Sequence, residues 1–203
     1  MDGKIKQMLS WKYINNTFYL GDKIITPTSI RNLEEIRPVL KNPKSEGPKV
    51  CYLVYRDVED PDKPGGLSAD VTVLLPGKIG DEYSKTHGHY HIGEGVEIYK
   101  VLSGEGMIIM QRPSFNFDTV EAVRLVKLPV NQQIEIPSGW GHTLINLGDT
   151  PLVAVNYQDP GIENLYAEFV KKKGAAYYIT EKSGKLELEP NPAYGEVPRP
   201  QTF

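Results

Sequence analysis

The sequence predicts an all-β protein, an antiparallel sandwich or barrel, and three observations support that fold class. Glycine and proline supply 19 and 16 of the 203 residues, so turn-forming residues interrupt the chain every few positions. Short runs of β-branched and aromatic residues recur between those turns at regular spacing. Hydrophobic residues make up 39% of the chain, which together with the glycines is enough to bury the core of one domain.

An N-terminal extension is predicted over residues 1–49, packed on the barrel or on a second copy of the chain. Its first 30 residues are polar and irregular, apart from extended pieces expected at Phe18–Leu20 and Lys23–Ile25. Residues 41–49 form a turn-rich connector to the barrel.

One short helix is predicted within this extension. Ile30, Leu33 and Ile36 recur at helical spacing. Ser29 precedes them as the expected N-cap, because its hydroxyl can accept a bond from a free backbone N–H at the helix start. Pro38 limits or kinks the helix, since proline has no N–H to donate.

The barrel is predicted to span residues 50–189. Short strands separated by turn residues are typical of a closed or sandwiched antiparallel architecture. The first eight strands are expected at Cys51–Asp57, Asp70–Leu75, Glu97–Leu102, Met107–Gln111, Ala122–Lys127, Gln133–Ile136, His142–Asn146 and Leu152–Tyr157.

The C-terminal region is predicted to add a helix, two strands and a tail. The helix is expected at Ile162–Lys173 and ends at Gly174, with lysines in its last turn. The strands are expected at Ala176–Thr180 and Leu186–Leu188. Four prolines then predict an extended tail over residues 190–203.

Composition excludes several classes of partner. The net charge of −3 provides no basic field, so a nucleic acid is not expected as a partner. No run approaches 18 uninterrupted apolar residues and the N-terminal residues contain no apolar signal segment, so neither membrane insertion nor secretion is expected. The one cysteine, Cys51, is expected to be a small buried thiol. A reducing, cytoplasmic location fits these features.

Three of the four histidines stand in two short motifs that predict a metal site. His89 and His91 are two residues apart, so on a strand both imidazoles project from one face. Glu97 begins the next strand, and His142 comes from a later strand that would face them across a closed barrel. Three imidazoles and one carboxylate suit a first-row divalent cation such as Fe²⁺, Mn²⁺, Zn²⁺ or Ni²⁺.

The surroundings of Glu97 decide between this site and a simpler interpretation. A pair of histidines on a strand is more often solvated, or hydrogen-bonded within the core, than bound to a metal. Glu97, however, lies between Val96 and Ile98 in an apolar run, where an unpaired carboxylate would be costly to bury. A cation would compensate that charge. We therefore expect one divalent metal ion per chain.

The spacing of these residues also resembles a known family. Two motifs carry the resemblance: His89-x-His91-x5-Glu97-x6-Gly104 and Pro137-x-Gly139-x2-His142-x3-Asn146. They resemble the two cupin motifs, which implies a double-stranded β-helix, or jelly-roll barrel. Tyr83 and Asn131 stand where the motifs usually carry glycine, and neither is a metal ligand.

A longer series of motifs narrows the resemblance. Between residues 50 and 180 the chain is similar to the cupin-type glucose-6-phosphate isomerases at Thr72–Gly80, Thr86–His91, Glu97–Tyr99, Gly104–Gly106 and His142–Pro151. The resemblance implies a metal-dependent isomerase, with iron as the first candidate metal. Its substrates would be glucose 6-phosphate and fructose 6-phosphate, in glycolysis and gluconeogenesis.

The resemblance further implies which residues contact the sugar phosphate. Those holding the phosphate would be Thr72, Thr86 and Gly88, and those lining the sugar would be Tyr99, Tyr157 and Tyr166. His87 stands where the family commonly has lysine or arginine, so it either supplies charge to the phosphate when protonated or has no role. The family often carries a histidine within 157–166, and here Glu163, Asn164 or water must replace it.

The small number of histidines constrains the acid–base chemistry. With three imidazoles on the metal and His87 assigned near the phosphate, Glu97 is predicted to transfer the proton, with Tyr157 as a hydroxyl donor or acceptor. Proton transfer through an enediol and a hydride shift both remain compatible with these residues.

Two other functions and one assembly are compatible with the same sequence. A metal site of this kind also suits oxygen-dependent enzymes such as dioxygenases, or a non-catalytic module that binds a metal or a sugar. Mannose 6-phosphate or another sugar phosphate also stays open as a substrate. The apolar pieces Trp11–Leu20 and Ile24–Ile30 could pack across a two-fold axis, which predicts a homodimer.

Overall fold

A six-stranded antiparallel sheet forms one wall of the molecule. The computed structural model describes residues 11–60 and 62–203. The strand order in this sheet is β13 (Gln133–Ile136), β10 (Glu97–Ser103), β15 (Leu152–Gln158), β6 (Ser68–Leu74), β5 (Val50–Tyr55) and β4 (Ser29–Asn32).

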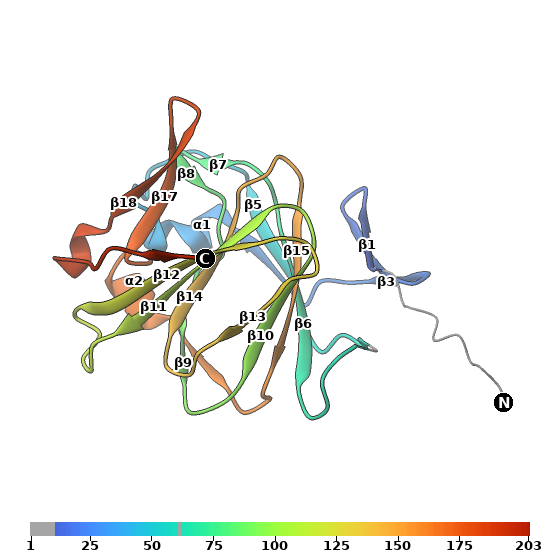
Figure 1. Ribbon diagram of the computed structural model, residues 1–203. Helices are drawn as coiled ribbons and strands as arrows, with labels where there is room; N and C mark the ends of the chain where they lie inside the picture. Colours follow the sequence, from blue (N-terminus) through green and yellow to red (C-terminus); the bar gives the residue numbers. More distant parts are fainter. Residues whose placement is uncertain (1–10, 61) are drawn as a thin grey trace.

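A four-stranded sheet faces the first one. Its strand order is β14 (Gly141–Asn146), β11 (Gly106–Pro113), β12 (Val120–Leu128) and β19 (Gln201–Thr202). Figure 1 shows β11, β12 and β14 on one side of the barrel and β6, β10 and β15 on the other. The main core lies between the two sheets. This is the jelly-roll barrel that the resemblance to cupins implies, so the all-β fold class is confirmed.

Smaller sheets complete the barrel and its surroundings. The N-terminal sheet contains β1 (Trp11–Ile14), β2 (Thr17–Leu20) and β3 (Lys23–Ile25). A second sheet has the order β18 (Lys185–Pro190), β17 (Tyr177–Lys182), β8 (Glu82–Tyr83) and β7 (Lys78–Ile79). A third pairs β16 (Glu163–Leu165) with β9 (Tyr90–Ile92).

The N-terminal segment covers the outer face of the large sheet. Phe18 and Leu20 are buried against outward-facing side chains of β5, β6 and β15. In Figure 1 the sheet β1–β2–β3 lies beside the barrel, next to β15 and β6. The first ten residues of the predicted extension lie outside the described residues.

The short helix of this segment begins later than its hydrophobic spacing predicts. Helix α1 spans Leu33–Ile36, with Asn32 as N-cap in a capping box with Glu35. Ser29 is not the cap, because Ser29–Asn32 forms strand β4 and pairs with β5. Pairing with a sheet edge outweighs a weak local helix preference. The 3-10 helix η1 (Arg37–Val39) follows, with proline at its start.

The C-terminal helix is also shorter than predicted. Helix α2 spans Ala167–Lys171, and Glu163–Leu165, which was expected to be helical, forms β16 against β9. Phe169 anchors α2 in the core. The tail contains the 3-10 helix η2 (Pro192–Tyr194) and then β19, which pairs in parallel with β12. Among the helices of the described ranges, none is long and apolar enough to cross a membrane.

Candidate metal centre and its cavity

Strand pairing brings the four predicted ligands to one end of the barrel. His89 and His142 face each other through two backbone bonds, from His89 N–H to the His142 carbonyl (3.2 Å) and from His142 N–H to the His89 carbonyl (2.9 Å). His91 follows on β9, and Glu97 is the first residue of β10. One ligand atom from each of the four side chains lies within 4.8 Å of all the others.

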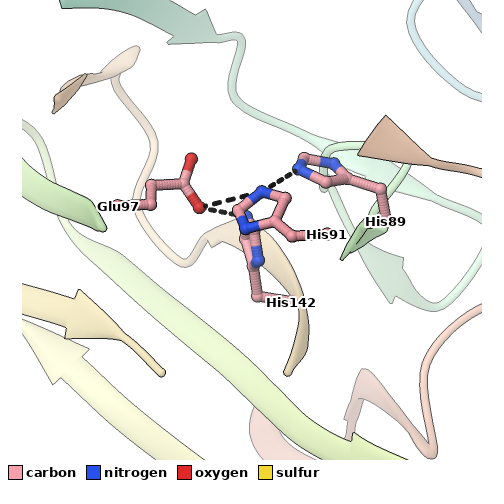
Figure 2. A group of neighbouring side chains, drawn as sticks. All are labelled: His89, His91, Glu97 and His142. Atoms are coloured by element: carbon pink, nitrogen blue, oxygen red, sulfur yellow. Dashed lines mark hydrogen bonds and ion pairs between the residues drawn. The ribbon is translucent and has the colours of Figure 1, made fainter. Parts of the chain in front are cut away.

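The Glu97 carboxylate points at the imidazoles. Its Oε2 lies 3.3 Å from Nε2 of His91 and 3.3 Å from Nε2 of His142. Nε2 of His89 lies 3.1 Å from Nε2 of His91. Figure 2 shows this convergence: His91 and His142 lie in the middle, with Glu97 on one side of them and His89 on the other.

Burial keeps the three imidazoles in the protonation state that a metal ligand needs. Desolvation lowers the pKa of His89 to about 3 and that of His91 to about 4, and it lowers the pKa of His142 well below its usual value. All three imidazoles are therefore neutral at pH 7 and offer a lone pair. Burial raises the pKa of Glu97 to about 8, although a bond from Asn156 favours the charged form.

An unpaired oxygen supports the same interpretation. Within the part of the chain that the structure describes, Oε2 of Glu97 has no hydrogen-bond partner, and the Glu97 side chain is 1% exposed. Leaving a buried carboxylate oxygen without a partner is costly. A divalent cation would satisfy it and would accept the lone pairs of the three imidazoles. The four residues present could hold a metal ion.

A cavity opens above the candidate ligands on the inner face of the large sheet. Side chains alternate between the two faces of each strand, so β6 contributes Asp70 and Thr72, and β10 contributes Glu97 and Tyr99. The complete lining is Arg31, Tyr52, Val54, Arg56, Asp70, Thr72, Thr86, Gly88, His89, Glu97, Tyr99, Asn156, Gln158, Asn164 and Tyr166. Five of the predicted sugar-phosphate residues are thus brought together with the candidate metal ligands: Thr72, Thr86, Gly88, Tyr99 and Tyr166.

Thr86 also ties the segment before His89 to the opposite sheet. Its Oγ1 accepts from the Leu144 N–H (3.0 Å) and lies 3.1 Å from Oγ1 of Thr143. Thr143 in turn donates to the Thr86 carbonyl (2.9 Å). These bonds fix the backbone that carries Gly88 and His89 into the cavity.

Tyr157 does not lie where the sequence interpretation placed it. Its ring is buried on the outer face of the large sheet, and its hydroxyl donates to Oδ2 of Asp60 at 2.8 Å. The residue of β15 that points inward is Asn156, whose Nδ2 donates to Oε1 of Glu97 at 3.1 Å. Since a shift of one residue moves a side chain to the other face of a sheet, Tyr157 is excluded from the cavity.

His87 lies beside the cavity and not in its wall. Its Nδ1 is 3.0 Å from the Gly88 carbonyl oxygen, and its ring meets the Tyr166 ring edge-on. Burial lowers the pKa of His87, so the imidazole is neutral at pH 7. A positive charge on His87 is therefore disfavoured in this geometry, and the role of His87 stays a prediction.

Several lining residues were not predicted, because the sequence does not show which side chains of a strand face the inside of the barrel. Asn156 is the one amide side chain in the run Leu152–Tyr157, and this polar residue in an apolar strand could have indicated a functional position. In a strand buried on both faces, however, the sequence does not show which alternate residues face the site. Arg31 was missed because its segment was expected to be helical. Of the replacements expected within 157–166, Asn164 lines the cavity and Glu163 is exposed.

Comparison with known proteins identifies relatives of this chain. A family model described as Glucose-6-phosphate isomerase (GPI) matches residues 38–194. A glucose-6-phosphate isomerase of Thermococcus litoralis is 30% identical over 82% of this chain and 87% of its own length. The enzyme of Thermococcus onnurineus is 31% identical over 71% of this chain and 73% of its own length.

The comparison with solved structures gives a more distant likeness. Recombinant oxalate oxidase in complex with glycolate aligns with 55% of this chain and 54% of that chain, at 23% identity and a TM-score of 0.42. At that distance the likeness assigns no function. The family match, which covers the candidate metal ligands, and the two relatives show that this chain belongs to the glucose-6-phosphate isomerase family.

Proposed function

We propose that the protein interconverts glucose 6-phosphate and fructose 6-phosphate, using one divalent metal ion held by His89, His91, Glu97 and His142. The observation that carries the proposal is the convergence of these four side chains within 4.8 Å, with His89 and Glu97 in the wall of a cavity. Membership of the isomerase family supports the substrate class. Fe²⁺ is proposed as the native ion, with Mn²⁺, Zn²⁺ and Ni²⁺ as alternatives that suit the same ligands.

The reaction moves one hydrogen between C1 and C2 of the open-chain sugar without net oxidation. When bound, the metal would supply a Lewis acid that polarises the sugar oxygens. Glu97 is proposed to take the proton from one carbon at its carboxylate and to return it to the other. Asn156 holds Oε1 of Glu97, which leaves Oε2 facing the histidines.

The remaining cavity residues are proposed to bind the substrate. Thr72, Thr86 and Gly88 would contact the phosphate, because hydroxyl groups and exposed backbone N–H groups donate to phosphate oxygens. Tyr99 and Tyr166 would line the sugar. Tyr166 accepts a bond from Nδ2 of Asn164 at 3.2 Å, and Oδ1 of Asn164 is buried without a partner among the described residues. That oxygen is available to a sugar hydroxyl.

Removing the metal is expected to abolish isomerisation. A Lewis acid at a reacting carbonyl contributes several kcal/mol to the barrier, so chelation should lower turnover by at least about 100-fold. The measurement is a coupled isomerase assay after chelation, followed by separate addition of Fe²⁺, Mn²⁺, Zn²⁺ and Ni²⁺.

The assay should be run without oxygen as well as in air. Equal turnover under both conditions supports an isomerase, whereas activity that requires oxygen would indicate an oxygen-dependent metal enzyme. Full activity in demonstrably metal-free protein would contradict the metal-dependent proposal. Tight metal binding without turnover of any sugar phosphate would leave a non-catalytic binding module.

A homodimer is also proposed, formed through the N-terminal segment. Ile14, Ile24 and Ile30 on β1, β3 and β4 are 52%, 66% and 48% exposed, which leaves aliphatic surface uncovered along the N-terminal segment. Light scattering at micromolar concentration is expected to give the mass of two chains. The mass of one chain would contradict this assembly.

The proposed substrates also imply a pathway and a cellular location. An enzyme that interconverts these two sugar phosphates would act in glycolysis and gluconeogenesis, and so in the cytoplasm. Cys51 is compatible with that reducing compartment. Burial raises the pKa of its thiol to about 11, so the thiol stays protonated and unreactive.

A further inference from the structure

Two arginines in the wall of the cavity differ in how their charge is used. Arg56, the residue directly after β5, pairs with Asp70 at 2.7 Å, and the Asp70 side chain is 6% exposed. Arg31 of β4 pairs with Glu35 at 2.8 Å, and the Glu35 side chain is 41% exposed. The buried carboxylate neutralises Arg56, whereas an exposed ion pair in water holds its partner weakly. Arg31 is therefore the arginine whose charge remains available to a ligand.

The geometry of Arg31 leaves part of its guanidinium open. Its Nη1 donates to Oε1 of Glu35, while Oε2 of the same carboxylate accepts the backbone N–H of Asn32 at the start of α1. Glu35 thus orients the arginine from one side. None of the described residues accepts a bond from Nε or Nη2 of Arg31. A planar guanidinium with free donors is the group best suited to bind a phosphate through two parallel bonds.

Strand register places Arg31 in the wall of the same cavity as the proposed phosphate residues. Arg31 is the cross-strand partner of Tyr52, so both side chains lie on the inner face of the sheet. The Tyr52 hydroxyl accepts the backbone N–H of His87 at 3.4 Å, which brings Tyr52 against the segment that carries Thr86 and Gly88. All these groups except His87 line the one cavity.

The cavity consequently has two chemically different ends. Along the sheet order β10–β15–β6–β5–β4, Glu97 lies on the first strand and Arg31 on the last. The candidate metal ligands gather at one end, and Arg31, with its unused Nε and Nη2 donors, lies at the other. A substrate that reacts at one terminus and carries a dianion at the opposite terminus matches this distribution.

We propose that Arg31, supplied by the N-terminal segment, binds the phosphate group of the substrate and sets the preference for phosphorylated sugars. This inference rests on the proposed function for its substrate. It assigns to strand β4 a direct part in recognition, beyond its part in the fold.

The test compares Arg31→Gln and Arg31→Lys with Arg112→Gln as a matched control. Arg112 pairs with Glu121 on the exposed face of β11, and both side chains are more than half exposed. For Arg31→Gln we expect KM for fructose 6-phosphate to rise about 10- to 100-fold, the range of a charge-assisted bond, with kcat within about 3-fold. The inhibition constant of inorganic phosphate should rise by a similar factor. Arg31→Lys should recover part of the loss, and metal content and the control should be unchanged.

Two outcomes would overturn the proposal. Unchanged KM and unchanged phosphate inhibition in Arg31→Gln would show that Arg31 does not bind the phosphate, although the isomerase function would stand. A fall in kcat with loss of metal, not recovered by lysine, would show a structural role instead.

The proposal can also be judged if the proposed function fails. Should the metal-loaded protein isomerise no sugar phosphate, calorimetric titration with inorganic phosphate still tests Arg31. Binding that weakens at least about 10-fold in Arg31→Gln would support the phosphate site. Equal binding by both proteins, or no binding by either, would overturn it.

Discussion

Replacing Glu97 by glutamine is expected to lower isomerase turnover by at least about 100-fold, the lower end of what a positioned acid–base group contributes. Glutamine has nearly the same shape and can still accept the bond from Asn156 through its amide oxygen. It cannot take a proton, and its amide nitrogen is no metal ligand. The measurement is the coupled assay on protein whose metal content has been determined, so that loss of metal and loss of proton transfer are separated.

An isotope experiment separates the two possible mechanisms. In deuterated water, proton transfer by Glu97 should bring solvent deuterium into the product, whereas a hydride shift would not.

Tyr157→Phe is the control variant for Glu97→Gln. It removes only the bond to Asp60 on the outer face of the sheet and is expected to keep turnover within about 3-fold, because it loses one hydrogen bond away from the site. Glu97→Gln with full metal and full turnover would refute the assignment, and a large loss in Tyr157→Phe would restore Tyr157 as a candidate.

Replacing Gly88 by alanine is expected to destabilise the protein by about 2–5 kcal/mol, the sum of left-handed backbone strain and overpacking. Gly88 has a φ of +78°. A Cβ there would lie 2.5 Å from Cε1 of the buried Phe169 ring and 3.1 Å from the His142 carbonyl oxygen. Both neighbours would have to move, so the position of His142 should also change and metal affinity should fall.

Gly93 provides a matched control for this substitution. Its φ of +91° is similarly left-handed, but nothing lies within 4 Å of an added Cβ. Gly93→Ala should therefore cost only the backbone strain, about 1–2 kcal/mol. Urea unfolding of the metal-free proteins measures both losses. Equal losses at the two glycines would show that the contact with Phe169 does not carry the effect.

Some of this site could be predicted from the chain alone, because the relevant signal is local. The spacing of His89 and His91 on one strand, followed by Glu97 in an apolar run, indicated both a shared face and a charge that needed compensation. The later His142 motif completed the set. All four side chains converge in the structure, since a closed barrel leaves inward-facing ligands few other places to lie.

Other features depended on long-range pairing and escaped sequence reasoning. Arg31 reaches the cavity only because Ser29–Asn32 adds an edge strand to β5, an interaction whose partner is some 20 residues away. The choice between Asn156 and Tyr157 depended on which face of β15 meets the barrel interior. In a strand buried on both sides, the residue pattern is the same for either choice.

The amino-acid sequence thus determined the fold class, the eight central barrel strands and the candidate metal-ligand set, because turn residues, short β-rich runs and ligand spacing are local properties. Only the tertiary structure decided the orientation of β15, the edge position of β4 and the two different ends of the cavity. These depend on register and on neighbours that are distant in the chain. The candidate metal ligands could be identified from the sequence, whereas the position of Arg31 and Asn156 in the cavity wall depended on the fold.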